Sequence, residues 1–264
     1  MKTPSRPTPP RSVRPKKKLG QHFLKDLNTA RAIADTVDAC PDLPVLEVGP
    51  GMGVLTQYLL PKARRVRVVE IDRESVEWLH EHYEGLHVIE GDFLKMDLSA
   101  LFHDTCAIIG NFPYNISSQI LFKVFEQRNR VTEVVGMFQK EVAERVAAGP
   151  GSKTYGILSV LLSAFYDIEY LFTVPEHVFN PPPKVKSAVI RLNRNDVTSL
   201  ECDEKLFVQT VKAGFNQRRK TLRNALRQLS MPLDTVPEEL LAKRAEQLSV
   251  EEFVTITKAI ESCQ

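Results

Sequence analysis

The sequence has few cysteines and no long apolar run, and each shortage excludes a class of protein. Its four cysteines are Cys40, Cys106, Cys202 and Cys263. They lie far apart and form no Cys-x-x-Cys pair, which argues against a zinc site and against a disulfide framework. No apolar run approaches the roughly 20 residues that span a bilayer, and no apolar segment follows the basic N-terminus. We therefore predict a protein of the reducing cytoplasm, with no membrane partner and no metal.

Acidic residues are missing from two stretches of the chain. Residues 1–18 and residues 205–233 each contain seven lysines and arginines and no acid. The rest of the chain has 21 basic against 33 acidic side chains, although the formal net charge is only +2. Two basic zones on an acidic body favour a polyanionic partner such as nucleic acid. The alternative is a solubilising tail and a solvated helix face, which explains the first zone alone equally well.

Short β-branched runs alternate with helical patterns through most of the 264 residues. This alternation predicts βαβ units, and hence an α/β fold with a doubly wound, mostly parallel seven-stranded sheet. The expected strands are Val45–Val48, Arg65–Glu70, His87–Glu90, Ala107–Gly110, Glu133–Phe138, Asp167–Leu171 and Ser187–Leu192. The expected helices are 27–37, 54–63, 74–83, 116–127, 140–147 and 155–165. No helical pattern separates the last two strands, so we expect them to pair as an antiparallel edge.

The two ends of the chain differ from this body. Residues 1–16 are basic and Pro-rich, which predicts a disordered leader before an α/β domain at 17–199. The strand pattern stops near residue 200, so residues 200–264 are expected to form a small all-helical domain. Four apolar positions share one face of a predicted helix: Phe215, Leu222, Leu226 and Leu229. Ser249 and Glu252 form a capping box that opens the last helix.

A Gly-rich turn follows the first expected strand in Leu46-Glu47-Val48-Gly49-Pro50-Gly51-Met52-Gly53. Glycines let the backbone approach a ligand closely and adopt positive φ. A dinucleotide fingerprint would need its third glycine at position 54, which is Val54, and no Gly-Lys-Ser/Thr of a P-loop follows. Glycines at 49, 51 and 53 resemble motif I of the S-adenosylmethionine-dependent methyltransferases. A plain tight turn is the alternative.

Polar residues follow each of the next expected strands. Glu70 ends the second strand, 19 residues after Gly51, where a carboxylate can accept from both ribose hydroxyls, and Asp72 is the fallback. Asp92 follows the third strand and Asn111 the fourth. The carboxyl ends of parallel strands meet along one rim, so these side chains are expected to converge there with Gly49. Any one acid alone is more simply a surface carboxylate or a helix cap.

Asn111-Phe112-Pro113-Tyr114 has the residue types that methyl transfer to an aromatic amine requires. The lone pair of such an amine is delocalised into the ring, and two hydrogen-bond acceptors can free it by holding its hydrogens. The candidates are the Asn111 side-chain oxygen and the Phe112 carbonyl, aimed by the Pro113 turn, with Tyr114 stacking on the base. This is catalysis by positioning and electrostatics. No Cys follows the proline, which disfavours cytosine C5 chemistry.

A second aromatic residue and several cations complete the candidate site. Phe179 precedes a rigid Pro-rich loop and is a candidate for the face opposite Tyr114, since a flipped base usually sits between two flat faces. Lys184 and Lys186 follow and could hold phosphates. The alternative for the segment that contains Phe179 is a buried loop anchor. On a helical wheel, the cations that form one stripe are Arg219, Arg223 and Arg227, with Lys220 beside them, and this stripe is expected to contact phosphates or simply to be solvated.

These motifs together resemble the KsgA family of small-subunit (16S) ribosomal RNA adenine dimethyltransferases. The resemblance runs from about Lys16 to the C-terminus. The segments that carry it are KLGQHFL at 18–24, LEVGPGMG, VEID, EGDFLK, GNFPYNISS, VFNPPPKVKSAVIRL and FNQRRKTLRNAL. It implies transfer of two methyl groups to each of two adjacent adenosines in the 3′-terminal hairpin loop, on a pre-assembled subunit, with S-adenosylmethionine as donor.

The resemblance also implies roles for individual residues. His22 and Leu24 would line the cofactor pocket together with Gly49, Gly51, Gly53, Glu70, Asp92 and Asn111. Arg218, Arg219, Lys220 and Arg223 would contact rRNA. The sequence departs from the family at His22, where many relatives have Asn, and at Phe112, where Leu or Ile is usual. Cofactor binding and the carbonyl role should survive both changes.

We therefore expect a monomeric enzyme that dimethylates small-subunit rRNA during late assembly of the subunit. Three rival functions remain. A DNA adenine methyltransferase fits the acceptor motif alone, but the FNPPPKV loop and basic appendage argue against it. A ribosome-assembly factor with little catalysis is disfavoured by the intact cofactor and acceptor motifs. A nicotinamide oxidoreductase is disfavoured by Val54.

Overall fold

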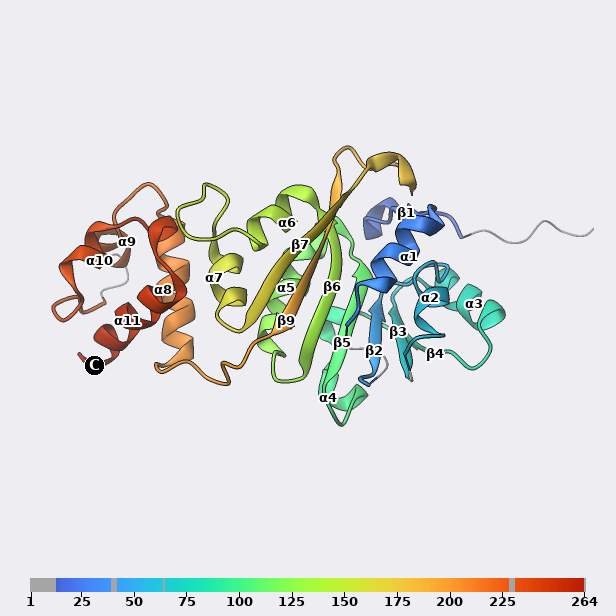
Figure 1. The fold of residues 1–264 in the computed structure, drawn as a ribbon, viewed down its shortest axis with the longest axis horizontal. Helices are drawn as coiled ribbons and strands as arrows, with labels where there is room; N and C mark the ends of the chain where they lie inside the picture. The colour runs from blue at the N-terminus through green and yellow to red at the C-terminus, as the bar shows by residue number, and fades with distance from the viewer. Residues whose placement is uncertain (1–12, 39–41, 64, 228–230, 264) are drawn as a thin grey trace, which may run out of the picture.

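In the computed structural model, a twisted seven-stranded sheet separates two layers of helices (Figure 1). The structure describes residues 13–38, 42–63, 65–227 and 231–263. The strand order is β4-β3-β2-β5-β6-β9-β7, in which the first five strands are parallel. The strands are β2 (Val45–Val48), β3 (Val66–Glu70), β4 (His87–Glu90), β5 (Cys106–Asn111), β6 (Val131–Gln139), β7 (Tyr166–Val174) and β9 (Ser187–Arg194). The predicted mostly parallel, seven-stranded sheet is confirmed.

The last two strands of the sheet pair antiparallel, as expected, but only one of them is an edge. β9 lies between β6 and β7 and runs antiparallel to both. β7 alone forms that edge of the sheet. Because the buried β9 lies inside the sheet, it presents four successive buried residues at its start, while β7 is largely half-exposed.

Helices cover both faces of the sheet, which makes it doubly wound. The helices are α1 (Leu27–Asp35), α2 (Thr56–Leu59), α3 (Arg73–His82), α4 (Leu98–Leu101), α5 (Ser117–Glu126), α6 (Lys140–Val146), α7 (Ile157–Ser163), α8 (Glu204–Asn216), α9 (Leu222–Arg227), α10 (Glu238–Ala242) and α11 (Val250–Glu261). Successive residues of a strand point to opposite faces of the sheet, so they pack against different helix layers. Leu46 and Ile108 pack with α5 and α7, whereas Val45 and Ala107 pack with α1 and α2.

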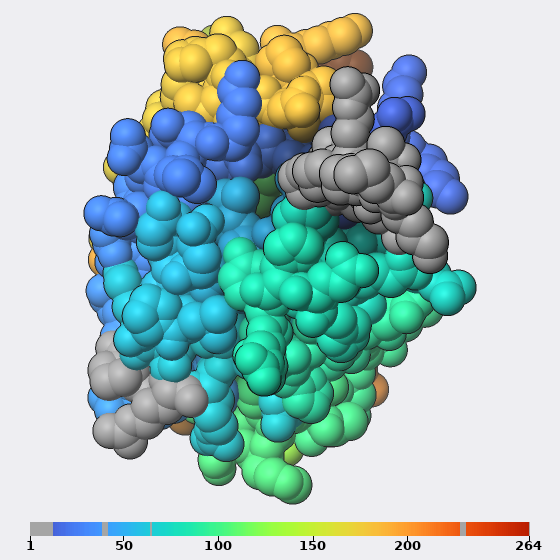
Figure 2. All heavy atoms as spheres, turned by 90° about the vertical axis from the view of Figure 1, so that its right-hand side faces the viewer, coloured from blue at the N-terminus to red at the C-terminus, as the bar shows by residue number. Residues whose placement is uncertain are grey.

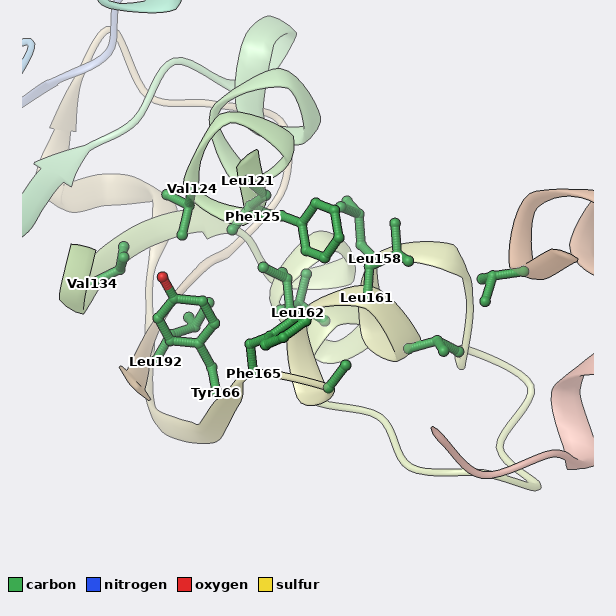
Figure 3. Packing of buried hydrophobic residues seen from close by; sticks show 14 of the residues in the cluster. Leu121, Val124, Phe125, Val134, Leu158, Leu161, Leu162, Phe165, Tyr166 and Leu192 are labelled. Atoms are coloured by element: carbon green, nitrogen blue, oxygen red, sulfur yellow. The ribbon is translucent and has the colours of Figure 1, made fainter. Parts of the chain in front are cut away.

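The larger hydrophobic cluster continues from the sheet into the C-terminal helices. Figure 3 shows Phe125 of α5 and Leu158, Leu161 and Leu162 of α7 gathered in one layer beside Phe165. The same cluster includes Val211 of α8 and other buried residues of α9–α11. The helical C-terminal region is therefore confirmed, and the boundary at residue 199/200 remains a prediction.

The expected basic stripe in this region is wrong as a single helix. α8 ends at Asn216 and α9 begins at Leu222, so Arg219 lies in a turn and cannot share a helical face with Arg223. After this break, the Leu222 amide donates to the carbonyl of Lys243 (2.8 Å), which lies outside both helices. Leu229 lies outside the described residues. The predicted capping box is present: Ser249 and Glu252 bond each other's backbone amides at 3.2 and 3.0 Å.

The N-terminal segment lies across the carboxyl end of the sheet. Residues 1–12 of the expected disordered leader lie outside the described residues, but residues 13–16 pack on the body: Val13 is buried and Lys16 pairs with Asp72. Two short strands that the sequence did not predict, β1 (Phe23–Leu24) and β8 (Phe179–Asn180), form a separate antiparallel pair. In Figure 2 the blue N-terminal segment accordingly lies beside the yellow loop at the top of the molecule.

Candidate functional site

A hollow of about 750 Å³, open mouth included, lies at the carboxyl ends of the parallel strands. Its wall contains Gly49, Glu70, Asp92 and Asn111, which come from four successive strand ends. The structure thus brings together the four positions whose convergence the sequence predicted. We call this space the main hollow.

The three glycines of the turn have different surroundings. Gly49 and Gly51 have φ of +71° and +58° and line the main hollow. A Cβ on Gly49 would meet nothing within 4 Å, so a ligand can approach its backbone, whereas one on Gly51 would lie 2.9 Å from the Phe23 ring. Gly53 does not line this hollow: its Cβ would overlap the Tyr83 ring at 2.5 Å, and the Tyr83 hydroxyl donates to its carbonyl. Its glycine is explained by packing.

Glu70 is held by the backbone on the wall of the main hollow. Its Oε2 accepts from the Gly51 amide at 3.0 Å, and its Oε1 accepts from the amides of Ile71 and Asp72 at 2.8 Å each. Burial raises the pKa of this carboxyl above its ordinary value, although the three amide bonds act in the opposite direction. The carboxylate is fixed in place and retains acceptor capacity, as a ligand for a ribose diol requires.

Asp72, the fallback for Glu70, serves another purpose. Its carboxylate accepts from Lys16 Nζ and, at 3.3 Å, from Gln21 Nε2. Burial raises the pKa of Asp72, but the bonds from Lys16 and Gln21 outweigh burial and hold it below the ordinary value. Asp72 also caps α3 and is not among the residues that line the main hollow. It anchors residues 16–24, which we call the strap, to the rim.

Asn111 is oriented by the strap. Its Nδ2 donates to the backbone carbonyl of His22 at 2.9 Å. This bond uses the donor end of the amide and leaves Oδ1 without a bonding partner among the described residues. The His22 ring lies against the Tyr114 ring, with centroids 5.4 Å apart and planes at 27°, and its Nδ1 lies 2.7 Å from the Pro181 carbonyl oxygen. His22 therefore lines the hollow at the acceptor end.

The remaining acceptor residues divide between wall and core. Phe112, Pro113 and Tyr114 all line the main hollow, and the Phe112 side chain is buried against Phe138 at 5.0 Å between centroids. The Tyr114 hydroxyl bonds Ser187 Oγ. Phe179 is 1% exposed and belongs to the hydrophobic core, so the structure does not bring its ring into this hollow. The buried-anchor alternative describes its observed position.

One carboxylate oxygen of Asp92 caps a turn, and the other lies on the wall of the main hollow. It caps the turn Phe93–Lys95 by accepting from the Leu94 amide through Oδ1 at 3.0 Å. Within the described part of the chain, its Oδ2 has a single charged neighbour, Lys95 Nζ, at 3.8 Å. One carboxylate oxygen on the wall of the main hollow therefore remains available as an acceptor.

Glu47 is a site residue that the sequence analysis did not identify. It lines a smaller space of about 370 Å³, the side hollow, which shares Phe23, Gly49 and Asn111 with the main hollow and also contains Leu24. Burial raises the pKa of Glu47 to about 8, against a hydrogen bond from Thr56 Oγ1. The available signal was an acid inside an otherwise apolar strand. Through the residues that they share, the side hollow adjoins the main hollow.

The chain is similar to known proteins over nearly its whole length. A family model described as ribosomal RNA adenine dimethylase matches residues 13–262. The chain belongs to this family. It is 63% identical over 253 residues to the ribosomal RNA small subunit methyltransferase A of Bacteroides thetaiotaomicron, covering 94% of this chain and 95% of that protein. The corresponding protein of Cytophaga hutchinsonii is 60% identical over 252 residues, covering 94% and 98%.

Two solved structures agree with this assignment. A dimethyladenosine transferase from Plasmodium falciparum superimposes with a TM-score of 0.79 at 28% identity, covering 91% of this chain and 98% of that one. The 23S rRNA methyltransferase ErmE gives 0.72 at 27% identity, covering 90% and 99%. The chain is therefore a methyltransferase by family and by fold.

The basic residues that are expected to contact RNA differ in whether they already form ion pairs with carboxylates. Arg219 and Lys220 are exposed in the turn after α8. Arg218 is bound to Glu246 at 2.7 Å, and Arg223 pairs with Glu238. The two remaining candidates, Lys184 and Lys186, are exposed in the loop after β8. Among the described residues, no cluster suited to a metal ion occurs and no helix is long and apolar enough to cross a membrane.

Proposed function

We propose that the protein transfers methyl groups from S-adenosylmethionine to N6 of two adjacent adenosines, dimethylating each, in the 3′-terminal hairpin loop of small-subunit rRNA. The observation that carries this proposal is the orientation of Asn111. Its amide nitrogen is bonded to the His22 carbonyl, so its oxygen is the atom left to accept from an amine. The relatives' description as small-subunit rRNA methyltransferases supports the choice of substrate.

The residues of the two hollows fit the proposed cofactor. Glu70 offers fixed acceptors for ribose hydroxyls, Asp92 one free oxygen for an adenine amine, and Gly49 an unobstructed backbone. The side hollow would take the methionine end, beside buried Glu47. When bound, the cofactor supplies a methyl group activated by a positively charged sulfur.

The acceptor amine would be held at the junction of strap and sheet. Asn111 Oδ1 and the Phe112 carbonyl would accept its two hydrogens, which shifts the nitrogen towards tetrahedral geometry and frees its lone pair. The Phe112 amide donates to the Met137 carbonyl at 3.2 Å, so the backbone that presents this carbonyl is tied to β6. Fixed acceptors stabilise a developing positive charge without reorganisation during the reaction. Once alkylated, the amine is cationic and readily loses its proton, so no strong general base is needed.

In this proposal the protein acts as a monomer in the cytoplasm, and its partner is the assembling small ribosomal subunit. Exposed Arg219 and Lys220 are suited to phosphates, because neither is paired with a described carboxylate. Phe179 would stack on the target base only if the pair β1–β8 opened, since its ring is buried in the conformation described. Tyr114 is the stacking partner that already lines the hollow.

The test offers labelled S-adenosylmethionine and three acceptors: unmethylated small subunits, naked rRNA and duplex DNA. Digestion and mass analysis identify the modified nucleoside. We expect dimethyladenosine from the subunit alone. Methylated DNA would favour a DNA methyltransferase instead, and tight subunit binding without transfer would favour an assembly factor.

The Asn111→Ala variant tests the mechanism. We expect it to abolish transfer while leaving cofactor affinity within a few-fold of wild type, because Glu70 and the glycine turn are unchanged. Asn129→Ala is the matched control: Asn129 is exposed in the turn before β6 and does not line the main hollow. Loss of cofactor binding in Asn111→Ala would make Asn111 a cofactor or structural residue.

A further inference from the structure

A third hollow lies at the opposite end of the sheet from the main hollow. It measures about 880 Å³, open mouth included, and its lining residues come from the segments that precede or begin β2, β3, β4 and β5. We call it the amino-end hollow. Its charged and titratable lining residues are Arg65, Arg67, His87, His103 and Asp104. Its lining, drawn from the described residues, is therefore net positive, on a body that is otherwise acidic.

The sheet brings these cations to one face. Arg67 lies directly opposite His87 in the β3–β4 ladder. Cross-strand partners point to the same side of a sheet. Arg65, the residue before β3, lines the same hollow. The Arg67 guanidinium lies 4.8 Å from the ring centroid of buried Phe102, so its position is set by packing before any ligand binds.

These arginines lack the ion pairs that other arginines of the chain form. Arg128 and Arg191 are each paired with a carboxylate. Within the described parts of the chain, neither Arg65 nor Arg67 forms such a pair. Two like charges that face one hollow repel each other, and a bound anion would relieve that repulsion. The His103 end of the wall is fixed as well, because Arg130 donates to its carbonyl at 2.6 Å.

We propose that the amino-end hollow binds phosphates of the small-subunit rRNA outside the target hairpin; this inference rests on the function proposed above. The guanidinium fork matches the oxygens of a phosphate. Along β3, Arg65 lies about 17 Å from Glu70 at ~3.3 Å per residue, at the opposite end of the strand from the methyl-transfer site. A phosphate held there is therefore well separated, along the sheet, from the site of methyl transfer.

The test compares Arg65→Glu and Arg67→Gln with wild type. Arg31→Glu is the matched control, because Arg31 also lies over an aromatic ring (Tyr58, 5.2 Å) but does not line this hollow. Affinity is measured over a salt series for unmethylated small subunits and for the isolated 3′-terminal hairpin. We expect each variant to lose subunit affinity several-fold and to lower the salt slope by about 1 for each lost phosphate contact.

Hairpin binding and cofactor binding should be unchanged in both variants and in the control. If Arg67→Gln unfolds because its contact with Phe102 is lost, exposed Arg65 still decides the question. Unchanged subunit affinity would overturn the inference. So would weaker binding with an unchanged salt slope, which indicates a protein contact, or an equal loss in Arg31→Glu, which indicates net charge alone. Wild-type protein that methylates subunits while the variants behave normally refutes only this inference; wild-type protein that neither binds nor methylates them refutes the proposed function as well.

Discussion

Replacing Glu47 by Gln should make the stability of the protein less dependent on pH. Glu47 is 1% exposed within β2, and burial, reinforced by the nearby charge of Glu70, raises its pKa to about 8 from an ordinary 4.5. The Thr56 hydroxyl bond to Oε2 opposes this shift without cancelling it. The folded protein therefore keeps Glu47 protonated at neutral pH, whereas the unfolded chain ionises it.

The sign and size of the effect follow from proton linkage. Below about pH 4.5 both states are protonated, and above about pH 8 both are ionised. Between these values unfolding releases a proton, so the free energy of unfolding falls as pH rises. Each pH unit corresponds to about 1.4 kcal/mol, so about 4 kcal/mol is lost between pH 4.5 and 7.5 as an upper bound. The Glu47→Gln variant should not show this fall in the free energy of unfolding, because glutamine does not titrate.

The assay is urea unfolding of the cofactor-free protein at several pH values from 4.5 to 7.5. A glutamine adds amide donors whose burial costs free energy, but that offset is the same at every pH and drops out of the slope. Glu84→Gln, on an exposed side chain, is the control and should keep the wild-type slope. Parallel curves for wild type and Glu47→Gln would refute the assignment of a protonated buried Glu47.

Two further predictions concern charged side chains. Arg219→Glu should weaken subunit binding and lower its salt slope more than Arg218→Glu does, because Arg218 is already paired with Glu246; equal effects in filter-binding assays would contradict this reasoning. Lys16→Ala should weaken cofactor binding several-fold by releasing the strap from Asp72, measured by calorimetry; an unchanged affinity would show that the pair does not hold the strap.

The sheet and the rim were predictable because their signals are local. Each of the five parallel strands is a short β-branched run followed by a helix, and right-handed βαβ connections leave little freedom in how such units assemble. The convergence of Glu70, Asp92 and Asn111 needed only the rule that parallel strands end on one side. The pKa of Glu47 was not predictable, because it depends on burial that a single acid in a strand does not reveal.

The errors arose where tertiary contacts decide. The pair β1–β8 joins two-residue strands some 155 residues apart in the chain, and two residues have no periodicity to detect. Phe179 lies in such a strand and packs into the core, so the buried loop anchor, the alternative to a stacking face, describes its position. No Gly or Pro lies between Asn216 and Leu222 to mark the helix break there, and the Leu222 amide after it bonds the distant Lys243 carbonyl.

The strap makes the two halves of the site depend on one another. At its start, Lys16 is anchored by Asp72, whose own backbone amide donates to Glu70 on the cofactor side. At its far end, the His22 carbonyl fixes the Asn111 amide on the acceptor side. Residues of one short segment therefore set both the wall for the donor and the orientation of the group that receives the amine. This arrangement explains why the acceptor motif alone does not specify the site: Asn111 has a defined orientation only when the strap is in place.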